Sequence, residues 1–459
     1  MKLSTLIKGG SAGLVALIAT TPVLAELIKA PTIEQQATMV DKGDTAWMLI
    51  SSALVLMMSI PALALFYGGL VRTKNMLSVL MQVFMIVSIA ALVWVGWGYS
   101  LAFTSGGDNM FIGGLSKAFL VGVTGGTYAA TFSNNVYIPE YAFVAFQMTF
   151  ACITPALIVG AFAERVKFSA LMIFVVAWLT IVYFPIAHMV WFWAGPDFLV
   201  DTPKDAGYLW DMGAIDFAGG TVVHINAGIA GLVGCLMIGK RLGFGKEATP
   251  PHSLTMTMIG GALLWVGWFG FNAGSNLEAN SITSLAIVNT FVAAATAGVA
   301  WMFAEWLLKG RPSLLGLVSG VVTGLVAVTP AAGFAGPMGA LVLGLVAGVA
   351  CFFFVAYAKN MFKLDDSLDV FGIHGLGGII GAIATGILVN PALGGAGVPD
   401  YLSVPGTLQV AAYDGAFMIT AQLKAVLFTI AFSGIGSFVL FKLVDLTMGL
   451  RVKEEVERE

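Results

Sequence analysis

Charged residues are scarce in this sequence. They make up 10% of its 459 residues, against roughly 25% in an average soluble domain. Hydrophobic residues make up 58% of the chain, and the mean hydropathy is +0.92. A soluble fold cannot remove that much apolar surface from water. The composition therefore excludes a soluble enzyme and predicts an all-α polytopic membrane protein.

Cysteines are few, and basic runs are missing. Cys152, Cys235 and Cys351 all lie in apolar stretches, so they indicate neither a disulfide framework nor a CxxC metal site. The 22 Lys and Arg residues are outnumbered by 25 Asp and Glu residues and form no cluster. This balance argues against nucleic acid as a partner.

The first 25 residues have the pattern of a secretory signal peptide. Lys2 and Lys8 precede a short apolar core, and small residues at 23–25 form a cleavage site before Glu26. A permanent first helix is the alternative. Cleavage leaves the mature N-terminus outside the cytoplasm, so the topology then follows from the number of spans.

Eleven apolar runs follow, and each is long enough to cross the roughly 30 Å hydrocarbon core of a bilayer as a helix. They lie near residues 45–71, 77–103, 138–163, 169–193, 216–239, 254–273, 282–308, 314–333, 336–358, 370–390 and 423–447. They define one transmembrane domain over residues 26–447, followed by a short charged tail over 448–459.

The distribution of basic residues indicates how these spans are oriented. With an outside start, the predicted inner segments carry fifteen Lys and Arg residues, and the outer segments carry five. The five are Lys29, Lys42, Lys117, Lys204 and Lys424. Since basic residues favour the cytoplasmic side, we expect a multi-pass protein of the cytoplasmic (inner) membrane, with the N-terminus outside and the C-terminus inside.

A weak internal repeat links the fifth and tenth spans. FAGGTVVHINAGIAGLVG (217–234) and DVFGIHGLGGIIGAIATG (369–386) each place one histidine shortly before a glycine-rich run. Spans five apart run in opposite directions, as in an inverted repeat of five plus five helices with an eleventh added. A chance match between two glycine-rich helices is the alternative.

Three ionisable residues interrupt the apolar spans, namely Asp216, His224 and His374. Such groups are costly in hydrocarbon and are therefore functional candidates. The histidines predict a pair that lines a pore; the alternative is packed histidines bonded to backbone carbonyls. Asp216 also suits a helix N-cap, which leaves room for a second role. Two histidines without a neighbouring cysteine or carboxylate are too few for a metal site, and no cofactor is expected.

The depth of the two histidines presents a difficulty. His224 lies eight residues after Asp216, roughly 12 Å along a helix, and His374 lies five residues after Asp369, roughly 7–8 Å. If both acids marked the edges of a 30 Å core, about 10 Å would separate the imidazoles. We therefore expect at least one of these acids to lie within the membrane level, shielded by protein.

Aromatic side chains gather toward the predicted outer side. Phe146 and Phe150 share one face of the third span, the sixth span carries Trp268 and Phe271, and Trp191 ends the fourth. Aromatic faces attract cations. An interfacial aromatic belt is the alternative, although phenylalanine has no polar edge to anchor it at lipid headgroups.

These features favour a cation that can lose its charge. They include no oxygen cage for Na⁺ or K⁺ and no Lys or Arg to attract an anion into the pore. Desolvation in an apolar passage disfavours the charged form of a weak acid. Ammonium can release a proton and pass as ammonia, whereas a metal ion cannot.

Six motifs are distinctive. They are FYGGLVRTKN (66–75), FACITPALIVGAFAERVKF (150–168), PIAHMVW (185–191), DFAGGTVVHINAGIAGLVG (216–234), GWFGFNAGS (267–275) and DVFGIHGLGG (369–378). With them, the sequence resembles the ammonium transporter family (Amt/Mep/Rh) along essentially the whole mature chain. Trp191 and the two histidines are similar to the bacterial Amt branch.

The resemblance implies a homotrimer of eleven-helix protomers, each with its own pore for ammonium or ammonia, used for nitrogen uptake. It implies an outer recruitment site at Trp191, Ser275 and Phe146, with Asp216 below it to hold its geometry. It also implies the gate and the pore, whose residues are the stacked Phe150 and Phe271, the neighbouring Trp268, the pair His224 and His374, and the proton-route candidate Gln147.

Two other functions stay open. One is an electroneutral channel for ammonia or carbon dioxide, and the other is an ammonium sensor that signals through a PII-type partner. No nucleophile accompanies Asp216 and His224, so an enzyme is not expected. In many relatives the tail continues past the pattern GLRVxEExERE and is linked to PII-type regulators, whereas this sequence ends at Glu459. PII binding is therefore an expectation only.

Overall fold

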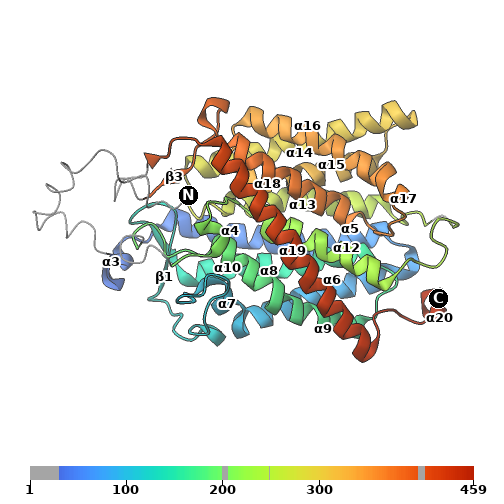
Figure 1. Cartoon of the computed structure of the whole chain (residues 1–459), viewed down its shortest axis with the longest axis horizontal. Helices are drawn as coiled ribbons and strands as arrows, with labels where there is room; N and C mark the ends of the chain where they lie inside the picture. The colour runs from blue at the N-terminus through green and yellow to red at the C-terminus, as the bar shows by residue number, and fades with distance from the viewer. Residues whose placement is uncertain (1–29, 199–204, 248, 402–408, 459) are drawn as a thin grey trace, which may run out of the picture.

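The computed structural model describes residues 30–198, 205–247, 249–401 and 409–458. The predicted signal peptide at 1–25 lies outside these residues. Eleven helices in the described part are long and apolar enough to cross a membrane, which confirms the predicted polytopic all-α fold. Figure 1 shows them from the side as one bundle, with the long helix α19 (Gly415–Met448) crossing its front.

Most spans combine α-helix with short 3-10 or π-helical turns, labelled η. The first span contains α4 (Lys42–Met57), η2 (Met58–Leu63) and α5 (Ala64–Leu70), and the second contains η3 (Thr73–Asn75), α6 (Met76–Val93), η4 (Trp94–Gly98) and α7 (Tyr99–Phe103). The third span contains α8 (Glu140–Ile158) and η6 (Val159–Phe162), and the fourth contains α9 (Phe168–Trp178), η7 (Leu179–Tyr183) and α10 (Phe184–Trp191). The fifth span contains η8 (Gly220–Ile225) and α12 (Asn226–Ile238). The sixth span is α13 (Leu254–Gly274), the seventh is α14 (Ser281–Lys309), and the eighth contains α15 (Leu314–Val328) and η9 (Thr329–Ala331). The ninth span contains α16 (Pro337–Phe353), η10 (Phe354–Ala358) and α17 (Lys359–Met361). The tenth contains η11 (Phe371–Gly375) and α18 (Leu376–Leu388), and the eleventh is α19.

Short elements lie outside the spans. The helical ones are α3 (Ile33–Thr38), η5 (Ala118–Leu120), α11 (Tyr208–Asp211), η12 (Pro391–Leu393) and α20 (Glu454–Arg458). Two antiparallel pairs join β1 (Tyr128–Ala130) with β2 (Tyr137–Pro139), and β3 (Pro399–Asp400) with β4 (Gln409–Val410). Both pairs belong to long loops at one end of the bundle, which we call the loop end. The opposite end carries α20 and is called the tail end (Figure 1).

Capping side chains fix where several spans begin. Asp41 accepts a backbone N–H at the start of α4 at 2.8 Å, and Ser253 does so for α13 at 3.2 Å. Asp414 caps α19 in the same way at 3.0 Å. Because α19 begins at 415 rather than near 423, Lys424 lies in the third turn of the helix and not in the loop before it. Its assignment to the outer side stays a prediction. A lysine stem can follow an apolar helix surface while its ammonium group reaches the interface.

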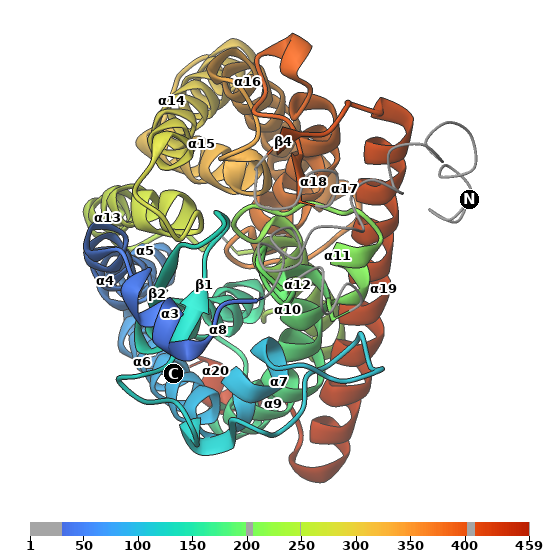
Figure 2. The ribbon, with the colours of Figure 1, turned by 90° about the vertical axis from the view of Figure 1, so that its left-hand side faces the viewer.

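Helices α14, α15 and α16 pack closely at small residues. A Cβ atom on Gly324 would lie 2.3 Å from the carbonyl oxygen of Ala293, and one on Gly348 would lie 2.6 Å from that of Ala297. Such contacts allow membrane helices to approach backbone to backbone. Figure 2 shows this three-helix group along the bundle, beside α13 and α4.

Buried polar contacts close the tail end. The Arg165 side chain donates to the carbonyl oxygens of Gly239 (2.7 Å) and Asp365 (2.8 Å) and to the Ser367 hydroxyl (2.6 Å). Arg241 donates to the Asp365 carboxylate at 2.7 Å. Burial alone would raise the pKa of Asp365, but its hydrogen bonds with Arg241 and the positive charges of Arg165 and Arg241 together outweigh burial and hold the pKa below its ordinary value. These contacts join the ends of the third, fifth and tenth spans.

The charged tail is docked at the same end. Glu457 of α20 accepts the backbone N–H of Leu242 at 2.8 Å and two bonds from the Arg451 guanidinium at 2.9 and 3.0 Å. Lys74 donates to the carbonyl oxygen of Glu457 at 3.1 Å. The tail therefore contacts the start of the second span and the segment that follows the fifth span.

Candidate transport pore

Two histidine-bearing helices meet inside the bundle. Each starts with a π-helical turn, and its histidine is the fifth residue of η8 and the fourth of η11. A Cβ atom on Gly228 would lie only 2.4 Å from the Cα atom of Gly375, so the two backbones touch. Glycine is needed at this crossing because any side chain would push the helices apart.

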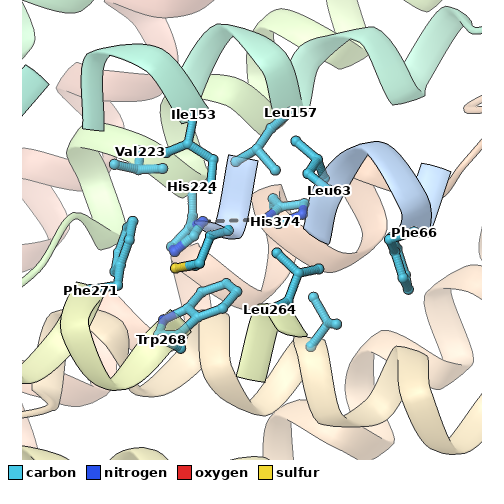
Figure 3. Close-up of a pocket in the computed structure, with 12 residues that line it drawn as sticks. Leu63, Phe66, Ile153, Leu157, Val223, His224, Leu264, Trp268, Phe271 and His374 are labelled. Atoms are coloured by element: carbon cyan, nitrogen blue, oxygen red, sulfur yellow. Dashed lines mark hydrogen bonds between the residues drawn. The ribbon is translucent and has the colours of Figure 1, made fainter. Parts of the chain in front are cut away.

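The crossing brings the two predicted pore histidines into contact. The Nδ1 atoms of His224 and His374 lie 3.2 Å apart, and the ring centroids lie 5.3 Å apart. Figure 3 shows the two rings joined across the cavity. One ring must donate and the other accept, so the contact cannot hold a proton on both facing nitrogens. The Nε2 atom of His224 is buried and has no hydrogen-bond partner in the described part of the chain.

The histidines lie in a narrow apolar cavity. It leaves about 10 Å³ for the centre of a water-sized sphere, which is on the order of one water molecule. Its lining residues are Met58, Leu63, Phe66, Ile153, Leu157, Val223, His224, Leu264, Trp268, Phe271, Val322 and His374. Apart from the imidazoles and the indole, every lining side chain is hydrocarbon or thioether. Such walls replace none of the hydration of a passing cation.

The Asp216 carboxylate is held by the start of η8. It accepts backbone N–H groups of Gly219 (2.8 Å), Gly220 (2.7 Å) and Thr221 (2.7 Å), and also the Thr221 hydroxyl. A negative charge at this position suits the positive end of the helix dipole. The capping role considered for Asp216 is thus present, although the acid precedes the helix by four residues.

Asp366 occupies the matching position on the other helix. It lies eight residues before its histidine, the same separation as for Asp216. Its carboxylate accepts the backbone N–H groups of Val370 (3.0 Å) and Phe371 (2.8 Å) at the start of η11. Burial raises the pKa of Asp366 to about 6, and the nearby Asp369 carboxylate adds to the rise. The two halves of the repeat are therefore built alike.

The depth estimate from the sequence used the wrong acid on one side. Asp369 forms an ion pair with Lys359 and is not the acid that binds the helix start. Both helices begin within roughly 6 Å, along their axes, of their own histidines. This explains how the rings meet. The depth of either acid in a bilayer stays a prediction.

Two phenyl rings separate the histidines from the loop end. The Phe150 and Phe271 centroids lie 4.4 Å apart, and Phe271 also lies 5.8 Å from the His224 ring. Both phenylalanines are fully buried. They come from α8 and α13, as the predicted gate requires.

The residues expected to recruit substrate lie beyond this gate. The Phe150 ring contacts Phe146 at 5.0 Å and Trp191 at 5.6 Å between centroids. The Trp191 indole N–H donates to the backbone carbonyl of Asp216 at 2.9 Å. Ser275 caps the end of α13, and its hydroxyl donates to the carbonyl oxygen of the second gate residue at 2.8 Å. The structure thus gathers all four on the loop-end side of the gate.

Nearly the whole chain matches one protein family. A model described as the Ammonium Transporter Family matches residues 46–459. The chain belongs to the ammonium transporter family. The resemblance seen in its motifs is therefore confirmed.

Relatives in this family are similar over most of their length. An ammonium transporter of Aquifex aeolicus is 44% identical, with 91% of this chain and 91% of the relative covered. An ammonium transporter of Bacillus subtilis is also 44% identical, with 90% and 95% covered. Among solved structures, Saccharomyces cerevisiae Mep2 is similar with a TM-score of 0.79 and 32% identity, with 92% of this chain and 89% of that chain covered. A structure titled Sensor Amt Protein has a TM-score of 0.78 and 25% identity, with 91% and 96% covered.

Of two further residues predicted for this member of the ammonium transporter family, Trp268 lines the cavity and Gln147 does not. Trp268 lines the cavity directly, because its ring stacks on His224 with centroids 5.5 Å apart and planes 21° apart. Gln147 is not among the lining residues. Its Oε1 atom is buried and has no hydrogen-bond partner among the described residues.

The sequence did not identify the rest of the cavity wall. Leu63, Phe66, Leu157 and Leu264 are ordinary residues of apolar spans, and nothing in their spacing separates a pore wall from helix packing. Asp366 was detectable, because its eight-residue distance from a histidine repeats that of Asp216.

Proposed function

We propose that this protein moves ammonium across a membrane by removing a proton at the loop end and passing ammonia through the histidine-lined cavity. The observation that carries the proposal is the 3.2 Å contact between two imidazoles inside an otherwise apolar cavity. Desolvation disfavours a charged weak acid in such a passage. An alkali cation has no neutral form, so it is excluded.

Recruitment of the cation is assigned to Trp191, Phe146 and Ser275. Aromatic faces attract a cation, and a hydroxyl oxygen accepts one of its hydrogen bonds. Asp216 holds this region in place through its backbone bonds rather than by touching substrate, and the Trp191 contact with its carbonyl oxygen supports that role. The proton then travels separately, and Gln147 is the candidate for its route.

The gate and the pore act in sequence in this scheme. Phe150 and Phe271 move apart briefly to admit ammonia, with Trp268 as the wall behind them. His224 and His374 then offer polar atoms in an apolar bore. Their shared proton orders the pair and keeps a hydrogen-bond acceptor available to a neutral guest.

We also propose the cellular setting that the family suggests. The protein acts as a homotrimer in the cytoplasmic membrane, with the loop end outside and the tail end in the cytoplasm, and the signal peptide at 1–25 is removed. The basic-residue bias supports this orientation. A PII-type regulatory protein is the proposed partner at the tail end, where α20 and its basic neighbours lie.

A reconstituted electrical assay tests the proposed function. Proteoliposomes on a solid-supported membrane receive an ammonium pulse and then a potassium pulse at equal concentration. We expect charge movement with ammonium and none with potassium. Uptake of ammonia without charge movement would favour the gas channel, and the absence of both responses would refute transport.

A sensor is the second candidate function. It is favoured by the similarity to the structure titled Sensor Amt Protein. Growth on limiting ammonium separates the two, because a transporter restores growth to a strain lacking ammonium uptake. A sensor without transport does not restore it.

A further inference from the structure

A chain of buried hydrogen bonds runs behind the tryptophan that faces the pore histidine. The Trp268 indole N–H donates to the Thr329 hydroxyl oxygen at 3.0 Å. Trp268 is 2% exposed and Thr329 is fully buried. Both partners are buried, so loss of the hydroxyl leaves the indole N–H without this acceptor.

This series of hydrogen bonds continues away from the cavity to residues of α13 and α14. The Thr329 hydroxyl lies 3.2 Å from Asn272 Oδ1, and Asn272 Nδ2 donates to the Thr290 hydroxyl at 2.9 Å. The Thr290 hydroxyl in turn donates to the carbonyl oxygen of Ala286 at 2.6 Å. Asn272 and Thr290 are fully buried.

The number of available protons decides which atoms donate and which accept in these hydrogen bonds. Thr329 has one hydroxyl proton, which it gives to Asn272 Oδ1 or to the Leu325 carbonyl oxygen at 2.8 Å. In both cases its oxygen is free to accept from Trp268, whose N–H can only donate. When the proton goes to Asn272, every bond points from the cavity wall toward α14. In either case Thr329 is the acceptor that the indole requires.

The same short segment also touches the helix that carries His224. The residue after Thr329 is Pro330, whose carbonyl oxygen accepts the backbone N–H of Phe217 at 3.2 Å. A Cβ atom on Gly220 would lie 2.6 Å from the Pro330 ring, so η9 packs directly on the first residue of η8. One segment thus fixes the positions of both the Trp268 indole and the start of η8.

We propose that Thr329 is a positioning residue of the pore, which fixes the plane of Trp268 against His224 and thereby maintains exclusion of potassium. The inference rests on the proposed function. Trp268 and His224 stack with planes 21° apart, and this wall contact keeps the bore narrow beside the imidazole. Without its partner, the buried indole N–H turns toward another acceptor, and the wall opens to water and to hydrated cations.

The test replaces Thr329 with valine, which keeps the shape of the side chain and removes the hydroxyl. The readout is the ratio of ammonium to potassium current in proteoliposomes. Loss of a buried hydrogen-bond partner corresponds to about a tenfold fall in this ratio. Thr329→Ser restores the hydroxyl and is expected to restore the ratio.

A matched control and a second variant separate positioning from general damage. Thr323→Val removes a fully buried hydroxyl of the neighbouring α15, which donates to the Ser319 carbonyl oxygen of its own helix, and is expected to leave the ratio unchanged. Trp268→Phe removes the indole N–H itself. In that background Thr329→Val is expected to add nothing, since the bond it removes is already gone.

The outcomes separate failure of the Thr329 inference from failure of the proposed function. An unchanged ratio in Thr329→Val, whatever its transport rate, overturns the inference, and so does a loss that adds fully to that of Trp268→Phe. If the unmodified protein itself shows neither ammonium current nor uptake, the proposed function fails first. A selective unmodified protein with an equally selective valine variant refutes only the role of Thr329.

Discussion

Replacing Asp216 with alanine removes the acceptor that holds the start of the fifth span. The carboxylate accepts three short backbone bonds from Gly219, Gly220 and Thr221, with lengths of 2.7–2.8 Å. A hydrogen bond to a charged group contributes about 1.5–3 kcal/mol. Taking the low end for a half-buried carboxylate gives about 5 kcal/mol for three such bonds.

That loss is large in relation to the whole protein. Folded proteins are stable by only about 5–15 kcal/mol, so the alanine variant is expected to unfold readily or to lose the first turn of η8. Asp216→Asn keeps one acceptor oxygen but turns an NH₂ group toward backbone donors. It is therefore expected to lose about half as much, roughly 2–3 kcal/mol.

Thermal unfolding in detergent, followed by the amount of monodisperse protein remaining, measures the order of these variants. The control is Asp414→Ala, which removes a single exposed cap bond of 3.0 Å at the start of α19 and costs about 1 kcal/mol. We expect the midpoint to fall least for the control, more for Asp216→Asn and most for Asp216→Ala. Transport is expected to be lost in the alanine variant.

One result would refute this reasoning directly. If Asp216→Ala unfolds at the same midpoint as Asp414→Ala, its backbone bonds do not stabilise the fold as argued. If that stable variant also transports ammonium at the normal rate, the essential role of the acid is wrong as well.

Three further predictions concern the pore and the tail end. His224→Ala and His374→Ala each lose transport or potassium exclusion in the electrical assay, whereas two alanine variants that transport ammonium and still exclude potassium would contradict the pore role. Because burial raises the pKa of Asp366 from 3.8 to about 6, its contribution to stability is present below about pH 4 and declines as pH rises through about 6, by up to about 3 kcal/mol. Asp366→Asn is therefore expected to flatten the dependence of the unfolding midpoint on pH between 4 and 7, and an unchanged slope would argue against the raised pKa. A lysine at position 165 cannot reach the three partners of the Arg165 guanidinium at once, so Arg165→Lys is expected to lower the free energy of unfolding by about 3 kcal/mol or more. An unfolding midpoint equal to that of the unmodified protein would show that the branched guanidinium is not needed there.

Much of the fold followed from the sequence because membrane spans need long apolar runs. Helix lengths, the scarcity of histidine and the repeated histidine context were enough to predict eleven spans and to pair His224 with His374 as pore candidates. The start of α19 was missed because Thr420, Gln422 and Lys424 interrupt its apolar residues, although Asp414 caps the helix. The fifth span begins at Gly220 rather than 216, since Asp216 binds the helix from outside it.

The remaining parts of the site depend on contacts that spacing does not encode. Thr329 is one of several threonines in apolar helices, and such residues commonly bond a carbonyl of their own helix. Only the packing of α13 against η9 shows that its oxygen also accepts a hydrogen bond from the Trp268 indole N–H. Leu63 and Leu264 likewise become pore walls through the helix arrangement and not through their identity.

The glycine crossing has a mechanical consequence for the tail end. Gly228 and Gly375 place main chain against main chain, so the two imidazoles are held by the helices themselves and share one rigid support. The helix that carries Gly228 ends beside Gly239, whose carbonyl oxygen is bound by Arg165 in the cluster near α20. A displacement of the docked tail is therefore expected to reach both rings through this pair of helices.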